Sequence, residues 1–176
     1  MLKAIFLSIS ILTASFQTGP SDEMFAKLQD APSESEAGDA AMDIWASWME
    51  SGSATVDIMM ERGVTAQANG ELAEARTYYD RAILIEPEYA EAWNRRATLF
   101  LMEENWSEAL RDLNETLRLE PRHFGAWSGL GMIFESIGAE KQALEAYREA
   151  LAIYPLMPAA TRAEARLSKA IEGQGL

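Results

Sequence analysis

Apolar residues recur along this chain at spacings of three, four and seven, which place their side chains on one face of an α-helix. Trp127 and Phe134 stand seven positions apart, two helical turns, and therefore share a face. Tyr147 and Ala150 stack in the same way on the segment that follows. Alanine, leucine and glutamate are abundant while β-branched residues are sparse, a balance that also favours helix. The pattern predicts an all-α fold.

The helical pattern repeats along the sequence. Pro87, Pro121 and Pro155 stand 34 positions apart. Counting back from each proline aligns three windows, 56–89, 90–123 and 124–157. A proline stops a helix because it lacks an N–H donor and disfavours helix in the residue before it. The last helix of each window is therefore expected to end before its proline.

A second break is expected in the middle of each window. Glycine readily takes the left-handed conformation that ends a helix, so Gly70 and Gly138 should separate two helices in the first and third windows. Asn105 is expected to take this role in the second window. Each window then predicts a pair of antiparallel helices.

Eight positions of the third window carry the signature residue types of a known repeat: Trp127, Leu130, Gly131, Phe134, Ala143, Tyr147, Ala150 and Pro155. At these positions the chain resembles the tetratricopeptide repeat (TPR) family. The second window departs from the pattern at Arg96, and the first departs at Arg62 and at Ala66, where an aromatic is usual. The resemblance implies an α-α superhelix of three repeats, in which Gly131 and Ala143 let paired helices touch.

Helical segments at both ends are expected to cap this array, because a single repeat cannot bury its apolar face alone. The C-terminal segment, 158–176, predicts a capping helix over 158–171, with Leu167 and Ile171 four positions apart. At the other end, Ser33 and Glu36 form a capping box that should start a helix over 34–49.

The predicted helix over 34–49 carries one apolar stripe, made of Ala37, Ala41, Ile44, Trp45 and Trp48. Ala41, Trp45 and Trp48 fall in phase with the second helix of a repeat. We therefore interpret residues 16–55 as a linker followed by a helical cap, a degenerate half-repeat. Both tryptophans are expected to pack on the first full repeat. The alternative is an exposed aromatic ledge for a partner.

The first fifteen residues have the order of a secretory signal peptide. Lys3 precedes an apolar run over 4–12, and the small residues Thr13, Ala14 and Ser15 follow. The run is shorter than the roughly 20 residues that a membrane-spanning helix needs. We expect cleavage near Ser15, a periplasmic location and no transmembrane segment in the mature chain. An uncleaved anchor and a buried first helix are the alternatives.

Composition excludes several classes of function. The chain has no cysteine, so it has no disulfide framework, thiolate nucleophile or cysteine-bound metal. Its formal net charge is −13, which makes nucleic acid a poor partner because the phosphate lattice requires a basic face. Residues 22–61 carry ten acidic residues and a single basic one, Lys27, and form either a solvated surface or a patch that selects basic partners.

No pattern in the sequence indicates catalysis, a metal or a cofactor. His123 is the single histidine and stands at a repeat junction, where we expect it to cap a helix rather than to bind a metal. Arg62 and Arg96 share one repeat position and should each pair with an acid. Asp112 is the expected partner of Arg96, and Glu86 or Asp80 that of Arg62. The chain is predicted not to be an enzyme.

The resemblance places the binding surface in a concave groove lined by the first helix of each repeat. The implied groove positions are Asp57, Met60, Val64, Gln67, Glu91, Asn94, Thr98, Leu101, Gly125, Ser128, Met132 and Glu135. This mixture of apolar, amide and hydroxyl side chains suits an extended or helical peptide. The cations with which one TPR subclass grips a C-terminal carboxylate are absent from these positions.

These observations predict an exported scaffold or adaptor that binds a protein or peptide segment. The first alternative is a chaperone-like binder of an exported client, in envelope or cytochrome assembly. A more distant alternative is an accessory domain of an enzyme system. The sequence leaves the oligomeric state open.

Overall fold

The computed structural model describes residues 19–174, and the predicted signal peptide lies outside this range. Within it the chain forms helices and no strand. The helices are α1 (Asp22–Gln29), α2 (Glu34–Trp48), α3 (Ala54–Ala68), α4 (Leu72–Ile85), α5 (Ala90–Met102), α6 (Trp106–Leu119), α7 (Phe124–Ser136), α8 (Glu140–Ile153) and α9 (Pro158–Gln174). The all-α prediction is confirmed.

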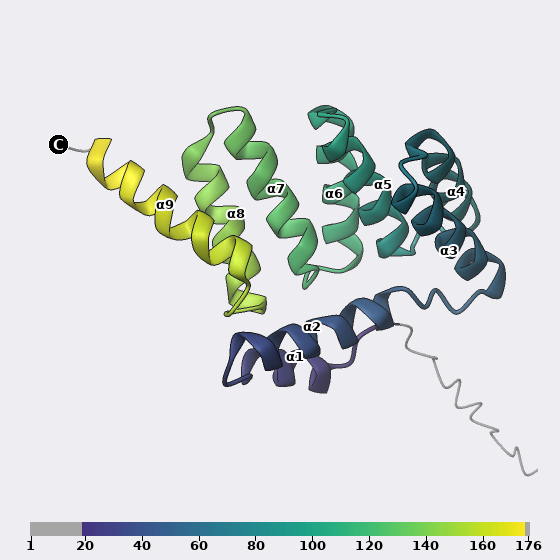
Figure 1. Ribbon diagram of the computed structural model, residues 1–176, viewed down its shortest axis with the longest axis horizontal. Coiled ribbons are helices and arrows are strands. Elements are labelled where there is room, and N and C mark those ends of the chain that lie inside the picture. Colours follow the sequence, from purple (N-terminus) through teal and green to yellow (C-terminus); the bar gives the residue numbers. More distant parts are fainter. Residues whose placement is uncertain (1–18, 175–176) are drawn as a thin grey trace, which may run out of the picture.

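Three antiparallel hairpins form the body of the molecule. Figure 1 shows α3–α4, α5–α6 and α7–α8 side by side in chain order, with α9 laid against the last hairpin. Leu167 of α9 is buried against Ala143 and Tyr147 of α8, and Ile171 packs at the edge of the same cluster. The predicted superhelix is confirmed, and α9 closes its C-terminal end.

Close contact within the first and third hairpins depends on glycine. Gly131 of α7 lies against the ring of Tyr147 on α8, and a Cβ atom added at Gly131 would stand 2.7 Å from that ring. Gly63 of α3 has the same relation to Tyr79 of α4. Both tyrosine rings are buried, so a larger residue at either glycine would force the two helices apart.

The breaks between paired helices fall at the predicted residues in the first and third repeats but not in the second. Gly70 and Gly138 have positive φ values of 79° and 74°. In the second repeat the left-handed residue is Glu104, with φ 54°, and not Asn105, which is the N-cap residue of α6. The prediction for Asn105 is therefore wrong by one residue. Glu104 stands 34 positions from each of the two glycines and takes their conformation despite its side chain.

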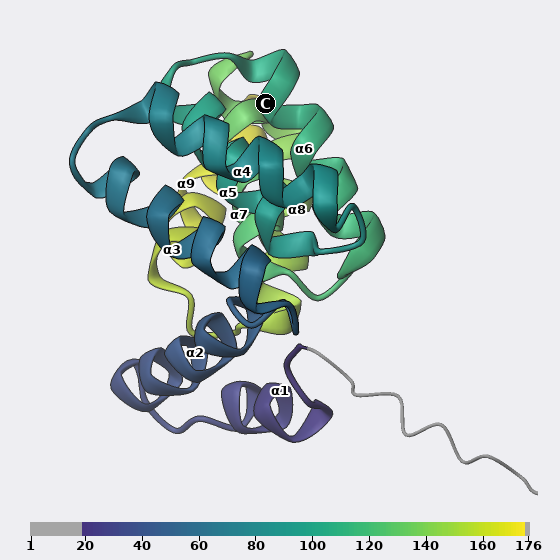
Figure 2. The ribbon, with the colours of Figure 1, turned by 90° about the vertical axis from the view of Figure 1, so that its right-hand side faces the viewer.

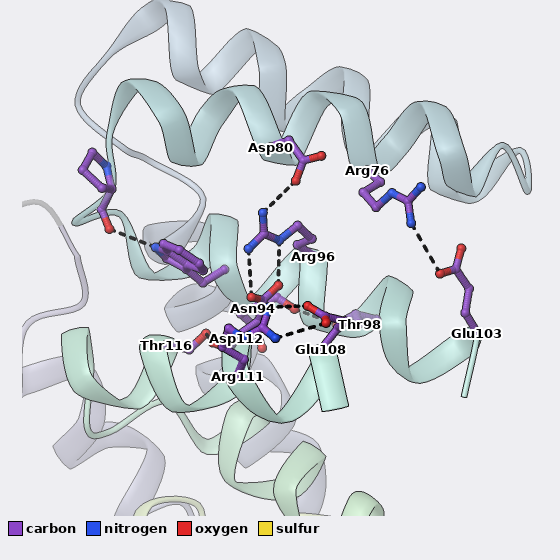
Figure 3. A network of polar contacts seen from close by, with 12 residues as sticks. Arg76, Asp80, Asn94, Arg96, Thr98, Glu103, Glu108, Arg111, Asp112 and Thr116 are labelled. Atoms are coloured by element: carbon purple, nitrogen blue, oxygen red, sulfur yellow. Dashed lines mark hydrogen bonds and ion pairs between the residues drawn. The ribbon is translucent and has the colours of Figure 1, made fainter. Parts of the chain in front are cut away.

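Arg96 joins three successive helices (Figure 3). Its guanidinium donates two hydrogen bonds to Asp112 of α6, at 2.7 and 2.8 Å, and one to Asp80 of α4, at 2.7 Å. Burial raises the pKa of Asp112, and the hydrogen bonds from Arg96 offset part of that rise. The predicted pair of Arg96 and Asp112 is confirmed. The prediction for Arg62 is wrong: it is exposed and unpaired among the described residues, because Asp80 faces α5 instead.

The helices α1 and α2 form a hairpin, the N-terminal hairpin, that does not continue the stack. Figures 1 and 2 show it lying across one edge of the array, below the ends of the repeat helices. Its apolar face packs on Phe124 and Tyr154, at the ends of the third repeat. Ser33 caps α2 as predicted, accepting a hydrogen bond from the Glu36 amide. The predicted packing of the two tryptophans on the first repeat is wrong.

Candidate peptide-binding groove

A hollow of about 370 Å³ lies between α5 and α7, the first helices of the second and third repeats. We call it the methionine-lined hollow. Its lining residues are Trp45, Asn94, Thr98, Leu101, Met102, Gly125, Ser128, Gly129, Met132 and Met157. Six of them belong to the predicted groove positions: Asn94, Thr98, Leu101, Gly125, Ser128 and Met132. No charged side chain is among the lining residues.

Two polar side chains of the methionine-lined hollow, Asn94 and Thr98, are already engaged within the protein. Asn94 is buried and donates a hydrogen bond to Glu91 at 3.0 Å, while the Thr98 hydroxyl donates to the Asn94 carbonyl at 2.9 Å. The exposed part of the lining is apolar, since Met102 and Met132 are 55% and 52% exposed. Flexible thioether side chains adapt to differently shaped apolar partners. The hollow is therefore suited to bury an apolar side chain.

Trp45 of the N-terminal hairpin closes one end of the methionine-lined hollow. A Cβ atom at Gly125 would stand 2.7 Å from the Trp45 ring, so only glycine allows this close contact. The ring is partly exposed and meets Phe124 edge to face, with centroids 5.5 Å apart. Trp48 is buried and contributes nothing to this surface. Trp45 is thus a wall of the hollow, while Trp48 belongs to the core.

The other predicted groove residues lie outside the methionine-lined hollow, and four of those positions are on α3. Met60 is fully buried in the core of the first repeat, so its assignment to the groove surface is corrected. Asp57 accepts hydrogen bonds from the amide and hydroxyl of Ser51, at 2.9 and 2.7 Å. Val64 is half-buried on the same helix.

Gln67, Glu135 and Glu91 are also used for internal contacts. Gln67 accepts a hydrogen bond from Tyr79 at 3.1 Å, and Glu135 forms an ion pair with Arg166 of α9 at 2.8 Å. Glu91 is buried, so its assignment to the groove surface is wrong and it belongs to the core. The hollow is also lined by Met102, Gly129 and Met157, which were not predicted, and by Trp45, for which an exposed aromatic ledge was only the alternative.

Glu91 is the centre of a buried polar network. It accepts hydrogen bonds from His123 at 3.0 Å, from Asn94 at 3.0 Å and from Arg95 at 2.5 Å. The other ring nitrogen of His123 accepts from the Ala126 amide at 3.1 Å, so the predicted helix-capping role of His123 is confirmed. Because Nδ1 is an acceptor, Nε2 carries the proton and donates to Glu91.

The charge of Glu91 is stabilised by these partners. Burial alone would raise the pKa of its carboxyl group, but the hydrogen bond from His123 and the positive charge of Arg95 together lower it. The His123 ring in turn stacks on Trp48, with centroids 4.0 Å apart and planes at 11°. The network therefore joins α5, the start of α7 and the N-terminal hairpin.

Between residues 19 and 174, no three histidine, aspartate or glutamate side chains come together in a way that could hold a metal ion. None of the helices described there has the length and apolar character needed to cross a bilayer.

Comparison with known sequences finds one family. A profile described as tetratricopeptide repeat matches residues 60–115 and 95–158. A TPR repeat-containing protein of Rhizobium etli is 37% identical over 134 residues, which make up 76% of this chain and 66% of that protein. The small glutamine-rich tetratricopeptide repeat-containing protein 2 of Saccharomyces cerevisiae is 30% identical over 97 residues, 55% of this chain and 28% of that protein. The chain thus spans just under two thirds of the first relative and less of the second.

Solved structures share the fold. The TPR domain of Arabidopsis OM64 superposes with a TM-score of 0.63 at 27% identity, over 69% of this chain and 98% of that one. The first TPR of Spaghetti (RPAP3), bound to the HSP90 peptide SRMEEVD, also gives a TM-score of 0.63, at 20% identity, over 66% of this chain and 93% of that one. At the latter identity the likeness concerns the fold alone.

Proposed function

Because this chain belongs to the tetratricopeptide-repeat family, we propose that it is an interaction scaffold that binds a peptide or protein segment in the methionine-lined hollow. The single observation that carries the proposal is the hollow itself: about 370 Å³ between α5 and α7, with an exposed lining of methionine and tryptophan. Its occupant contributes an apolar side chain that fills this space. We assign no catalytic step to the chain.

The absence of basic side chains from the hollow limits which peptides can bind there. The solved complex of Spaghetti holds a peptide whose sequence, SRMEEVD, ends in acidic residues. The methionine-lined hollow offers no lysine or arginine to such a peptide, and the protein carries a formal net charge of −13. An acidic segment would therefore meet repulsion without a compensating ion pair. We propose that the bound segment is neutral or basic and carries an apolar side chain that fills the hollow.

Substituting Met102 and Met132 together by glutamate is expected to weaken peptide binding by about tenfold or more, because two charges would then face the apolar anchor. Both side chains are more than half exposed, so the substitutions should leave the fold intact. Peptides are first selected on the wild-type protein from a random display library. Their affinities for wild type and variant are then measured by fluorescence polarisation.

The control is Met42→Glu, which introduces one such charge at a methionine that is 66% exposed on α2 and lies outside the hollow. It should bind the selected peptides as the wild type does. Equal affinities of all three proteins, each with an unchanged circular dichroism spectrum, would place the binding surface elsewhere. Asn94 is unsuited to this test because it is buried and bonded to Glu91.

We also propose that the scaffold acts outside the cytoplasm. The support is the sequence of residues 1–15, with its charged, apolar and small segments in the order of a signal peptide. Expressed with its full sequence in a Gram-negative bacterium, the protein is expected in the periplasmic fraction with a mature N-terminus near Ser15. Intact-mass measurement checks the N-terminus. A soluble cytosolic form that retains Met1 would refute export.

A further inference from the structure

A second hollow, of about 220 Å³, opens where the end of α2 meets the α4–α5 connection and the end of α6. We call it the acidic hollow. Its lining residues are Gly19, Trp48, Glu50, Ser51, Glu86, Glu88, Tyr89, Ala90, Glu91, Leu119 and Glu120. Five of these are glutamates, and no lysine, arginine or histidine is among them. The acidic hollow thus differs in charge and in place from the methionine-lined hollow.

Two residues that line the acidic hollow each carry a buried polar atom without a hydrogen-bond partner. Over residues 19–174, only the Nε1 atom of Trp48 and the Oε2 atom of Glu86 are buried side-chain atoms that lack a hydrogen bond. Both residues line this one hollow. Trp48 is 4% exposed, and its position is fixed by the stacked ring of His123 and by the hydrogen bond from Tyr89 to its carbonyl oxygen. Its indole N–H is therefore a fixed, unused donor.

Part of the negative charge around the acidic hollow is uncompensated. Glu91 is paired with Arg95, Glu120 with Arg122, and Glu88 with Arg118 at 3.5 Å. Glu86 and Glu50 form no ion pair with the described residues. A buried oxygen of an unpaired carboxylate is costly to the protein, so this position favours a bound cation that donates a hydrogen bond.

We propose that the acidic hollow binds a protonated amine with a carbonyl group beside it, as found at the amino terminus of a peptide and in a free amino-acid amide. The ammonium group donates to Oε2 of Glu86, and the neighbouring carbonyl oxygen accepts from Nε1 of Trp48. A single bridging water occupies about 30 Å³ in the liquid and would fill only a small part of this space. The two unused atoms, one acceptor and one donor, match the two groups of the ligand.

Titration with glycinamide, followed by the indole N–H resonances of the ¹⁵N-labelled protein, tests this site. Trp48→Phe identifies the resonance of Trp48 among those of the five tryptophans. Glycinamide is expected to shift this resonance in a saturable manner. N-acetylglycinamide, which has no ammonium group, should not shift it. Triglycine amide is the second probe: a matching shift assigns the site to peptide amino termini, and a shift with glycinamide alone assigns it to small amines.

Glu86→Gln is expected to weaken glycinamide binding by about tenfold, because it removes the charge that strengthens the hydrogen bond while keeping the shape of the side chain. Glu145→Gln removes the same charge from an exposed position outside the acidic hollow and should bind as the wild type does. The proposal is overturned if glycinamide leaves the Trp48 resonance unchanged, as in a hollow that holds only water. Equal effects of the acetylated probe, or unchanged affinity of Glu86→Gln, also overturn it.

Discussion

Replacing Glu91 by alanine is expected to lower the free energy of unfolding by about 3–5 kcal/mol. The carboxylate is buried and accepts hydrogen bonds from His123, Asn94 and Arg95, so its removal leaves buried donors without an acceptor. Urea unfolding followed by circular dichroism measures the change. The matched control is Glu88→Ala, a neighbouring glutamate with a side chain that is 75% exposed. Its effect should stay within about 0.5 kcal/mol.

Glu91 is also expected to make the free energy of unfolding depend on pH, in a direction that follows from its lowered pKa. The pKa of the Glu91 carboxyl group in the folded protein lies below its ordinary value of 4.5, although burial opposes this. Its ionised form therefore contributes stability that is fully present above pH 4.5 and is lost as the pH falls through the lowered pKa. The stability difference between wild type and Glu91→Gln should shrink between pH 7 and pH 3. A difference that stays constant over this range would contradict the assignment.

Trp48→Ala is the second substitution for which we expect a loss of about 3–5 kcal/mol in the free energy of unfolding. The ring is buried, stacks on His123 at 4.0 Å between centroids, and packs against Phe124 at 5.1 Å and Phe25 at 6.1 Å. Its removal leaves a cavity between the N-terminal hairpin and the repeats. Amide hydrogen exchange should then show faster exchange in α1 and α2 than in α5 and α6.

The control for this prediction is Trp45→Ala. Trp45 is partly exposed, so its truncation should cost less stability while it widens the methionine-lined hollow. Equal losses for the two variants, measured in the same urea titration, would mean that the buried stack on His123 contributes no special stability. Unchanged exchange in α1 and α2 of the Trp48 variant would contradict the role of Trp48 in holding the hairpin.

The repeats could be predicted because each depends on contacts close in sequence. Gly131 and Tyr147 meet within one hairpin, and Pro121 marks its boundary by local stereochemistry. The short helix α1 was missed, although Ser21 caps its start and Phe25 and Leu28 stand three positions apart. Eight residues carry too little periodicity to be distinguished from a linker.

The position of the N-terminal hairpin could not be predicted because its contacts join distant parts of the chain. Trp48 stacks on His123, 75 positions later, and Arg122 lies 4.0 Å from the centre of the Phe25 ring. No periodic pattern encodes such a pairing. The phase of α2 instead suggested a half-repeat, which would have placed Trp48 on α3.

Part of the candidate site could be predicted, because helical spacing determines which side chains share a face. The helical spacing predicts that Asn94, Thr98 and Met132 lie on one surface, and all three line the hollow between α5 and α7. It could not show that Glu91, on the same face, would be covered by the N-terminal hairpin and become buried. Met157 lies in the α8–α9 connection, where register gives no guidance.

The order in which the chain is synthesised has a consequence for the N-terminal hairpin. Asp22 pairs with Arg122, 100 positions later, and Gln29 donates a hydrogen bond to the carbonyl of Ala152, 123 positions later. At about 5–20 residues per second, a ribosome needs roughly 5–25 s to add these residues. During that time the apolar face of α2 has no surface to cover it. Docking of this hairpin is therefore a late step of folding, and it joins the first helices of the chain to the start and the end of the third repeat.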